Sequence, residues 1–220
     1  QPFRLEISKR GTIDNLIWRA AKRIPPGPGQ AEIEIMAAGL NFHDVLNALG
    51  SYPGLSIPVG VECSGVIAAV GEGVEDFKVG DEVVSFSLST FASFVTSPTA
   101  YMAHKPAHAN FEQAGALPLV FMTAHYALNY LARLSKGERV LIHSATGGVG
   151  LAAIQLAHLA GAEVFATAGS EEKREYLRSL GQRKHSKDTV RSILKFRGTL
   201  AQAAPAELAD LTASTLISKR

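Results

Sequence analysis

The sequence predicts a β-rich unit followed by a mixed α/β unit, and three observations carry this prediction. Up to about Pro118, short apolar alternations are separated by glycine and proline, which is typical of a compact all-β domain. Beyond Pro118 the apolar runs lengthen and alternate between strand-like and helix-like spacing, as in βαβ units. Finally, a glycine-rich turn over residues 144–150 lies between a predicted strand and a predicted helix.

The composition excludes several classes of protein. Of the 220 residues 46% are hydrophobic and 19% are charged, as in ordinary globular chains. The single cysteine rules out a disulfide framework and a four-thiolate zinc site, and no apolar run reaches the roughly 18 residues that a membrane span needs. The net charge of +2 gives no reason to expect nucleic acid. Because the chain starts without methionine or a signal-peptide pattern, we expect a cytoplasmic piece of a longer polypeptide.

The β-rich half contains two clear strand patterns and one short helix. Residues 31–37 alternate with period two, and residues 61–70 form a second strand-like run, in which we expect Cys63 to be buried and unreactive. Between these strands, residues 41–50 predict a helix with Asn41 as its N-cap and Asp44 in its first turn.

The second half has the order of a βαβ unit with helices before and after it. A parallel strand is expected to be a short apolar run, and glycine is expected where a helix ends. The predicted elements are a helix over 124–134, a strand over 139–143, a helix over 151–160, a strand over 163–168 and a helix over 171–180.

The glycine-rich turn is the first candidate binding site. Glycines allow the backbone to approach a pyrophosphate, and the N–H groups that open the following helix attract its charge. The spacing differs from the G-x-G-x-x-G fingerprint, so a tight turn without a ligand is the alternative. The candidate cofactor-binding residues of this turn are Thr146, Gly147, Gly148, Val149 and Gly150.

The end of the second predicted strand bears on the choice of cofactor. About 20 residues beyond the glycines, an NAD site offers a carboxylate to the ribose, whereas an NADP site offers a small residue and a cation. Counting from Gly150 leads to Ser170 and then to Lys173, which favour NADPH. Glu171 and Glu172 lie between them and argue against NADPH, unless they only supply acids to the first turn of a solvated helix.

Six motifs follow one another along the chain, over residues 41–50, 52–54, 60–65, 79–81, 121–128 and 140–150. In this order they resemble the enoyl reductase domain of modular polyketide synthases, within the medium-chain dehydrogenase/reductase superfamily and close to quinone oxidoreductases. The resemblance extends to about Gly181. It implies a GroES-like β-barrel that binds substrate over residues 1–120, followed by a Rossmann domain that binds NADPH from residue 121.

The resemblance also implies an activity. It is the NADPH-dependent reduction of the α,β double bond of an enoyl thioester carried on an acyl carrier protein, beside neighbouring domains of a synthase. Such chemistry needs a nicotinamide that is held in place, a polar group that stabilises the enolate oxygen, and a proton donor. Zinc-dependent relatives carry a cysteine where Asn41 stands and a histidine where Val61 stands, so we expect no metal.

The same resemblance gives roles to single residues. Tyr52 is either the proton donor or an aromatic packed beside Pro53. Lys173 is either a proton donor or a ligand of the 2′-phosphate of NADPH, with a solvated helix lysine as the third alternative. Asn41 and Thr123 match positions that line the nicotinamide, and the N-cap role of Asn41 is compatible with that role.

Beyond Gly181 the chain departs from the family pattern. Residues 1–180 hold 14 Lys and Arg against 17 Asp and Glu, a balance of −3, whereas residues 181–220 hold 8 against 3, a balance of +5. In that tail, residues 190–197 predict a short helix and residues 205–218 an amphipathic one. We therefore expect a partial Rossmann domain over 121–181, with an uncovered sheet edge, and a divergent basic tail with a C-terminal helix over 182–220.

Three functional hypotheses follow. The chain is an enoyl reductase that works within a larger synthase or is completed by a partner. Alternatively, it is an incomplete, non-catalytic structural remnant of such a domain, or a quinone oxidoreductase.

Overall fold

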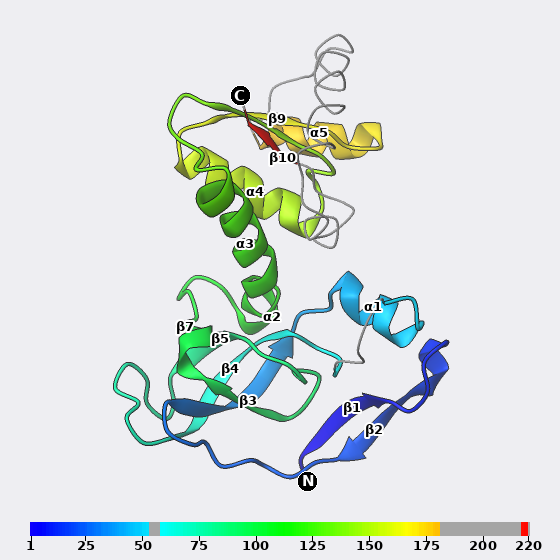
Figure 1. Ribbon diagram of the computed structural model, residues 1–220, viewed down its shortest axis with the longest axis vertical. Helices are drawn as coiled ribbons and strands as arrows, with labels where there is room; N and C mark the ends of the chain where they lie inside the picture. The colour runs from blue at the N-terminus through cyan, green and yellow to red at the C-terminus, as the bar shows by residue number, and fades with distance from the viewer. Residues whose placement is uncertain (53–57, 181–216, 220) are drawn as a thin grey trace. The chain divides into compact units, whose positions relative to one another are not determined.

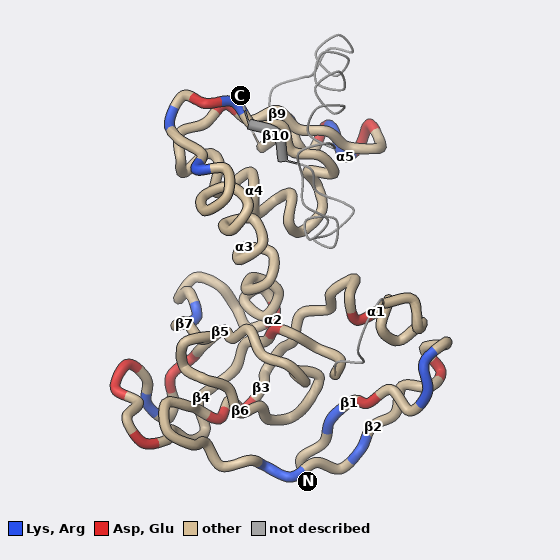
Figure 2. The backbone as a smooth tube through the Cα atoms, viewed as in Figure 1, with Lys and Arg blue, Asp and Glu red and all other residues tan. Residues whose placement is uncertain are grey.

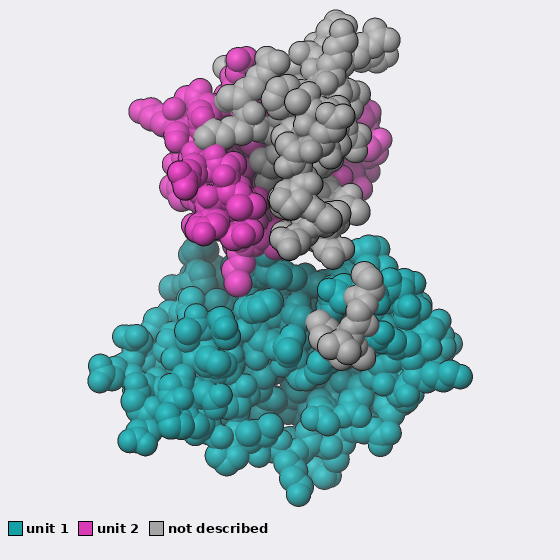
Figure 3. Space-filling model, viewed as in Figure 1, with its two compact units in different colours: residues 1–119 teal, residues 120–220 magenta. Residues whose placement is uncertain are grey.

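The computed structural model describes residues 1–52 and 58–180, together with the backbone of residues 217–219. The chain forms two compact units, residues 1–119 and residues 120–220 (Figure 3).

The first unit is built on a five-stranded antiparallel sheet with the order β6-β3-β4-β5-β7. Of these strands, Figure 1 labels β3, β4, β5 and β7. The strands are β3 (Gln30–Ala38), β4 (Glu62–Val70), β5 (Glu82–Phe86), β6 (Phe94–Pro98) and β7 (Met102–His104). Alternate residues of β3 and β4, among them Ile33, Cys63 and Ile67, form a buried apolar cluster with Val83 and Val95. The prediction that Cys63 is buried in a strand is confirmed.

A separate two-stranded hairpin opens the chain. It consists of β1 (Phe3–Ile7) and β2 (Leu16–Ala20), with the 3-10 turn η1 (Ile13–Asn15) between them. Glu6 pairs with Arg4 at 2.6 Å and with Arg19 of the opposite strand at 3.0 Å. Figure 2 shows basic and acidic positions along this hairpin. Both arginine side chains are more than half exposed, so these pairs contribute little to stability.

Three short helical segments complete the first unit: α1 (Phe42–Ala48), the 3-10 turn η2 (Thr99–Tyr101) and α2 (Phe111–Gly115). The helix α1 begins after Asn41, whose extended backbone occupies the N-cap position, as predicted. Asp44, in the first turn of α1, accepts the backbone N–H of Asn41 at 2.9 Å, which satisfies a donor that the helix itself leaves unpaired.

The second unit contains the predicted βαβ arrangement. Its elements are α3 (Pro118–His125), which crosses the boundary between the units, the π-helical η3 (Tyr126–Leu131), β8 (Arg139–Ile142), α4 (Gly148–Leu159), β9 (Glu163–Ala166) and α5 (Glu171–Ser179). β8 and β9 are parallel, with Val140 opposite Val164, and α4 connects them. The helix predicted from residue 124 starts six residues earlier, because Pro118 needs no N–H partner in a first turn.

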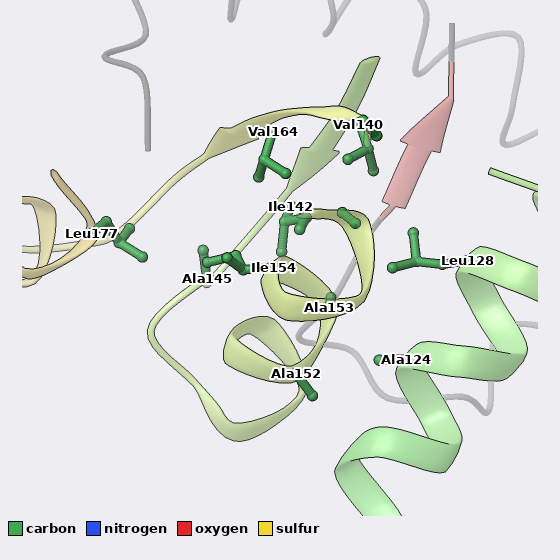
Figure 4. Packing of buried hydrophobic residues seen from close by; sticks show 12 residues of the cluster. Ala124, Leu128, Val140, Ile142, Ala145, Ala152, Ala153, Ile154, Val164 and Leu177 are labelled. Atoms are coloured by element: carbon green, nitrogen blue, oxygen red, sulfur yellow. The ribbon is translucent and has the colours of Figure 1, made fainter. Parts of the chain in front are cut away.

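One side of the β8–β9 pair is packed on α4 (Figure 4). Val140 and Ile142 of β8 and Val164 of β9 belong to the same buried cluster as Ala153 and Ile154 of α4. Alanines on the buried face of α4 let the helix lie close to the sheet, because a methyl side chain takes up little space between the two backbones. This packing places the first turn of α4 directly after the end of β8.

The C-terminal end of the chain differs from the prediction. Residues 217–219 form the strand β10 (Ile217–Lys219), which pairs antiparallel with β8 and gives a sheet of order β10-β8-β9. The predicted helix over 205–218 is therefore wrong at its last two residues. A strand there pairs backbone groups of β8 that would otherwise lack partners. Residues 205–216 and the helix predicted over 190–197 lie outside the described residues.

No helix in the described ranges is both long and apolar enough to cross a membrane.

Candidate functional site

The glycine-rich turn of the second unit is held in place by backbone hydrogen bonds. The N–H of Ala145 donates to the carbonyl oxygen of Thr167, just beyond β9, at 3.0 Å. The N–H of Gly147 donates to the carbonyl oxygen of Ser144 at 2.9 Å, and Ser144 has a positive φ of 51°. The turn is thus fixed to the carboxyl ends of both parallel strands, which is the edge of an α/β sheet where ligands bind.

Gly150 is required by the closeness of this packing. A Cβ at Gly150 would lie 2.6 Å from the Cα of Ala145 and 2.7 Å from the carbonyl oxygen of Ser144, closer than any carbon atom can approach without displacing the backbone. The first turn of α4 therefore lies directly against residues 144–145.

The start of α4 offers hydrogen-bond donors to an anion. Gly147 is the N-cap and supplies no side-chain acceptor, and the N–H groups of Gly148, Val149 and Gly150 are first-turn donors without an intrahelical acceptor. Gly147 and Gly148 are exposed, and Thr146 is half-buried beside them. The positive end of this 12-residue helix adds to the attraction for a phosphate. The donor set fits the diphosphate of a dinucleotide.

The segment after β9 carries Ser170 and Lys173. Ser170 caps α5, because its hydroxyl accepts the N–H of Lys173 at 3.3 Å. Lys173 is exposed, and within the described residues its ammonium group has no ion-pair partner. Since β8 and β9 are parallel neighbours, this segment and the glycine-rich turn follow the same edge of the sheet.

Glu171, one of the two acids that argued against NADPH, is held by arginines of its own helix. Arg178 lies 2.6 Å from Oε1 of Glu171, and Arg174 lies 2.8 Å from Oε2. Hydrogen bonds from Arg178 and then Arg174 lower the pKa of the exposed Glu171 carboxyl. Both carboxylate oxygens are thus already engaged.

The first unit contains a buried polar cluster around Asn41. The side-chain amide of Asn41 donates from Nδ2 to Oε1 of Glu62 at 2.7 Å. Asp44 accepts the N–H of Gly60 at 2.8 Å with its other oxygen, Oδ1. Asp44 and Glu62 are 3% and 2% exposed, so two carboxylates lie out of contact with bulk water and depend on these donors.

Glu62 has a second partner in the first turn of α3. Its Oε2 accepts the N–H of Leu119 at 2.8 Å. Gly39 packs against this carboxyl group, because a Cβ at Gly39 would lie 2.7 Å from Cδ of Glu62. Burial raises the pKa of the Glu62 carboxyl, the hydrogen bonds from Leu119 and Asn41 lower it, and the charge of Asp44 raises it further.

Tyr52 is half-buried and contacts the ring of His43 edge to face, with 4.6 Å between the centroids and 89° between the planes. Nδ1 of His43 lies 3.6 Å from Oδ1 of Asp44. The predicted neighbour Pro53 lies outside the described residues.

The structure groups the predicted residues within each unit. Thr146 to Gly150, Ser170 and Lys173 follow one sheet edge of the second unit, whose helix α3 also carries Thr123. Asn41 and Tyr52 flank α1 in the first unit. Sequence reasoning missed Glu62, which contacts Asn41 although 21 positions separate them in the chain. The signal available in the sequence was an acidic residue inside an otherwise apolar, strand-like run.

A groove of about 300 Å³ in the first unit is lined by residues 4–7, Pro58, Val59 and Ser89. It contains none of the predicted site residues. Within the described parts of the chain, no group of three or more His, Cys, Asp or Glu side chains is arranged to hold a metal ion.

Comparisons with known proteins agree with these two units. The profile of the alcohol dehydrogenase GroES-like domain matches residues 27–116, and that of the zinc-binding dehydrogenase family matches residues 148–202. The solved structure of the CurK enoyl reductase is 44% identical, with a TM-score of 0.81 over 90% of this chain and 64% of that chain. The chain belongs to the medium-chain dehydrogenase/reductase superfamily. The predicted fold class, a GroES-like barrel followed by a Rossmann-type domain, is confirmed, and the family implies a nicotinamide cofactor.

The relatives of this chain include polyketide synthases. Phthioceranic/hydroxyphthioceranic acid synthase of Mycobacterium tuberculosis (strain ATCC 25618 / H37Rv) is 46% identical over 183 residues, which cover 81% of this chain and 9% of that protein. Highly-reducing polyketide synthase 1 of Aureobasidium melanogenum is 41% identical over 185 residues, 80% of this chain and 8% of that protein. The chain thus spans less than a tenth of these synthases and about two thirds of the CurK enoyl reductase.

The buried strand β4 makes Cys63 a direct probe of the first unit. Burial, and then the charge of Glu62, raise the pKa of its thiol from the ordinary 9.0 to about 12. At pH 8 only about one thiol in 10,000 is then ionised, against about one in ten for an ordinary cysteine. We expect no reaction of the folded chain with a thiol-specific disulfide reagent, and one thiol per chain after denaturation in urea. Rapid labelling of the folded chain would contradict the burial of β4.

Proposed function

We propose that this chain is an NADPH-dependent enoyl reductase that reduces the α,β double bond of an enoyl thioester carried on an acyl carrier protein. The observation that carries this proposal is the set of N–H groups in the first turn of α4 that have no acceptor within the helix, packed against the preceding turn at Gly150, in a chain similar to the CurK enoyl reductase. The proposed setting is the cytoplasm, beside neighbouring domains of a polyketide synthase.

The residues of the second unit have separate proposed roles in holding NADPH. The N–H groups of Gly148, Val149 and Gly150 bind the diphosphate, with Thr146 and Gly147 completing the turn. Beyond β9, Ser170 and Lys173 bind the 2′-phosphate, which a hydroxyl and an ammonium group suit. The engagement of Glu171 by two arginines supports this choice, because the acid is then not free to accept the ribose hydroxyls that NADH would offer.

The remaining residues are proposed to act at the nicotinamide and the substrate. Asn41 and Thr123 line the nicotinamide, and bound NADPH supplies the hydride that the β-carbon of the enoyl thioester receives. The enolate that results needs a proton at its α-carbon, and we assign this donation to the phenol of Tyr52, whose ring His43 supports from the side. Because Tyr52 donates the proton in this assignment, Lys173 binds the 2′-phosphate and is not the proton donor.

The activity is tested with crotonyl-pantetheine as a small substitute for the carrier-bound substrate. We expect the purified chain to consume NADPH and form butyryl-pantetheine, and to leave a quinone unreduced. Reduction of the quinone but not of the thioester would instead support a quinone oxidoreductase. Saturable NADPH binding without either reaction, or no binding at millimolar NADPH, would support a non-catalytic remnant.

The cofactor preference is tested by Lys173→Ala. Loss of one charge-assisted contact to a phosphate costs about 1.5–3 kcal/mol, so we expect NADPH binding to weaken about 10- to 100-fold, with little change for NADH. The matched control is Lys136→Ala, an exposed lysine of the same unit, which is expected to change neither affinity. Equal loss for both cofactors in Lys173→Ala would remove the assigned 2′-phosphate role. Nucleotide fluorescence measures all these affinities.

A further inference from the structure

Glu62 is a buried carboxylate that none of the proposed steps uses. It is 2% exposed, and its two oxygens accept one N–H each, from Nδ2 of Asn41 at 2.7 Å and from the backbone of Leu119 at 2.8 Å. Gly39 leaves the space that the carboxyl group fills. A charge in such a place is costly unless its partners are well fixed, so its position is closely determined.

The contact with Glu62 determines how the amide of Asn41 is turned. An amide nitrogen carries two hydrogens, and donation of one to Oε1 of Glu62 fixes the direction of the other. The backbone of Asn41 is fixed as well, because its N–H donates to Oδ2 of Asp44 at 2.9 Å. The side chain therefore presents its second amide hydrogen in one direction.

A carboxylate suits this place better than an amide would. Two donors, Nδ2 of Asn41 and the N–H of Leu119, face Glu62, and an ionised carboxyl group only accepts hydrogen bonds. A glutamine has the same size but would direct its NH2 group at one of these donors. If this NH2 group faces Asn41, the Asn41 amide must turn over to keep a hydrogen bond, and if it faces Leu119, the N–H of Leu119 loses its acceptor.

We propose that Glu62 is a positioning residue that orients the Asn41 amide as a hydrogen-bond donor to the carboxamide oxygen of the nicotinamide. This inference rests on the proposed function, because it needs a nicotinamide beside Asn41. Glu62 itself does not touch the cofactor and acts through Asn41 alone.

The test is a double-mutant cycle on NADPH affinity, with Asn41→Ala, Glu62→Gln and the double variant. We expect each single change to weaken NADPH roughly tenfold, the loss of one hydrogen bond with its partner left unpaired. The double variant is expected to bind as weakly as Asn41→Ala and no weaker, because Glu62 has no other route to the cofactor. Losses that multiply in the double variant, or an unchanged affinity in both Glu62→Gln and Glu62→Asp, would overturn the inference.

A fragment of the cofactor separates positioning from a general structural effect. Adenosine 2′,5′-bisphosphate has the 2′-phosphate but no nicotinamide, so its affinity is expected to stay unchanged in Glu62→Gln. Equal weakening of the fragment and of NADPH would assign Glu62 a structural role and contradict positioning. Glu62→Asp provides a second variant: it keeps the charge, but its shorter side chain cannot reach both donors, and the same selective loss is expected.

The control variant is Glu32→Gln, another buried glutamate of the same sheet, at 3% exposure, which pairs with Arg23. It is expected to lower the melting temperature without changing the affinity for NADPH. If the unchanged chain fails to bind NADPH while it binds the fragment, the nicotinamide site and with it the inference fail. If NADPH and the fragment bind normally and only the Glu62 effect is missing, the proposed function stands and the inference alone fails.

Discussion

The closeness of α4 to the turn that precedes it is the constraint on which the candidate cofactor site depends. At Gly150 there is no room for a side chain, because the backbone of residues 144–145 occupies the place of a Cβ. This contact holds the first turn of α4 against the end of β8. The hydrogen bond from the N–H of Ala145 to the carbonyl oxygen of Thr167 holds the glycine-rich turn against the end of β9. The free N–H groups of the helix therefore have a fixed direction before any ligand arrives, which lowers the cost of binding.

In the first unit, two buried carboxylates fix the position of Asn41 in a comparable way. Asp44 and Glu62 each accept two N–H groups, and in both cases one donor belongs to Asn41. Asp44 holds the backbone of Asn41, and Glu62 holds its side chain. Burial keeps these bonds in place, because bulk water does not reach either carboxylate to replace its protein donors. Asn41 is thereby fixed at both ends, as a residue must be if it is to orient a cofactor.

Local patterns in the sequence predicted β3, β4 and α1 of the first unit and the helices and strands of the second unit up to α5. The period-two run became β3, the second strand-like run became β4, the capped segment became α1, and the glycine-rich turn lies between β8 and α4. The partners of Glu62 were not predictable in this way, because Asn41 and Leu119 are 21 and 57 positions away and only the folded chain brings them together. The misassigned end of the C-terminal helix has a similar cause, since Ile217–Lys219 pairs with β8, 75 or more positions earlier, and tertiary pairing overrides local amphipathicity.

Binding of the cofactor phosphates by the glycine-rich turn is the central proposal for the second unit. Titration of Gly150→Ala with NADPH tests it, with Gly169→Ala as the control because a Cβ at Gly169 meets open space. We expect Gly150→Ala to lose at least tenfold in affinity, since the added methyl group must push α4 away from the turn, and Gly169→Ala to bind like the unchanged chain. Unaltered NADPH affinity in a folded Gly150→Ala chain would contradict the account.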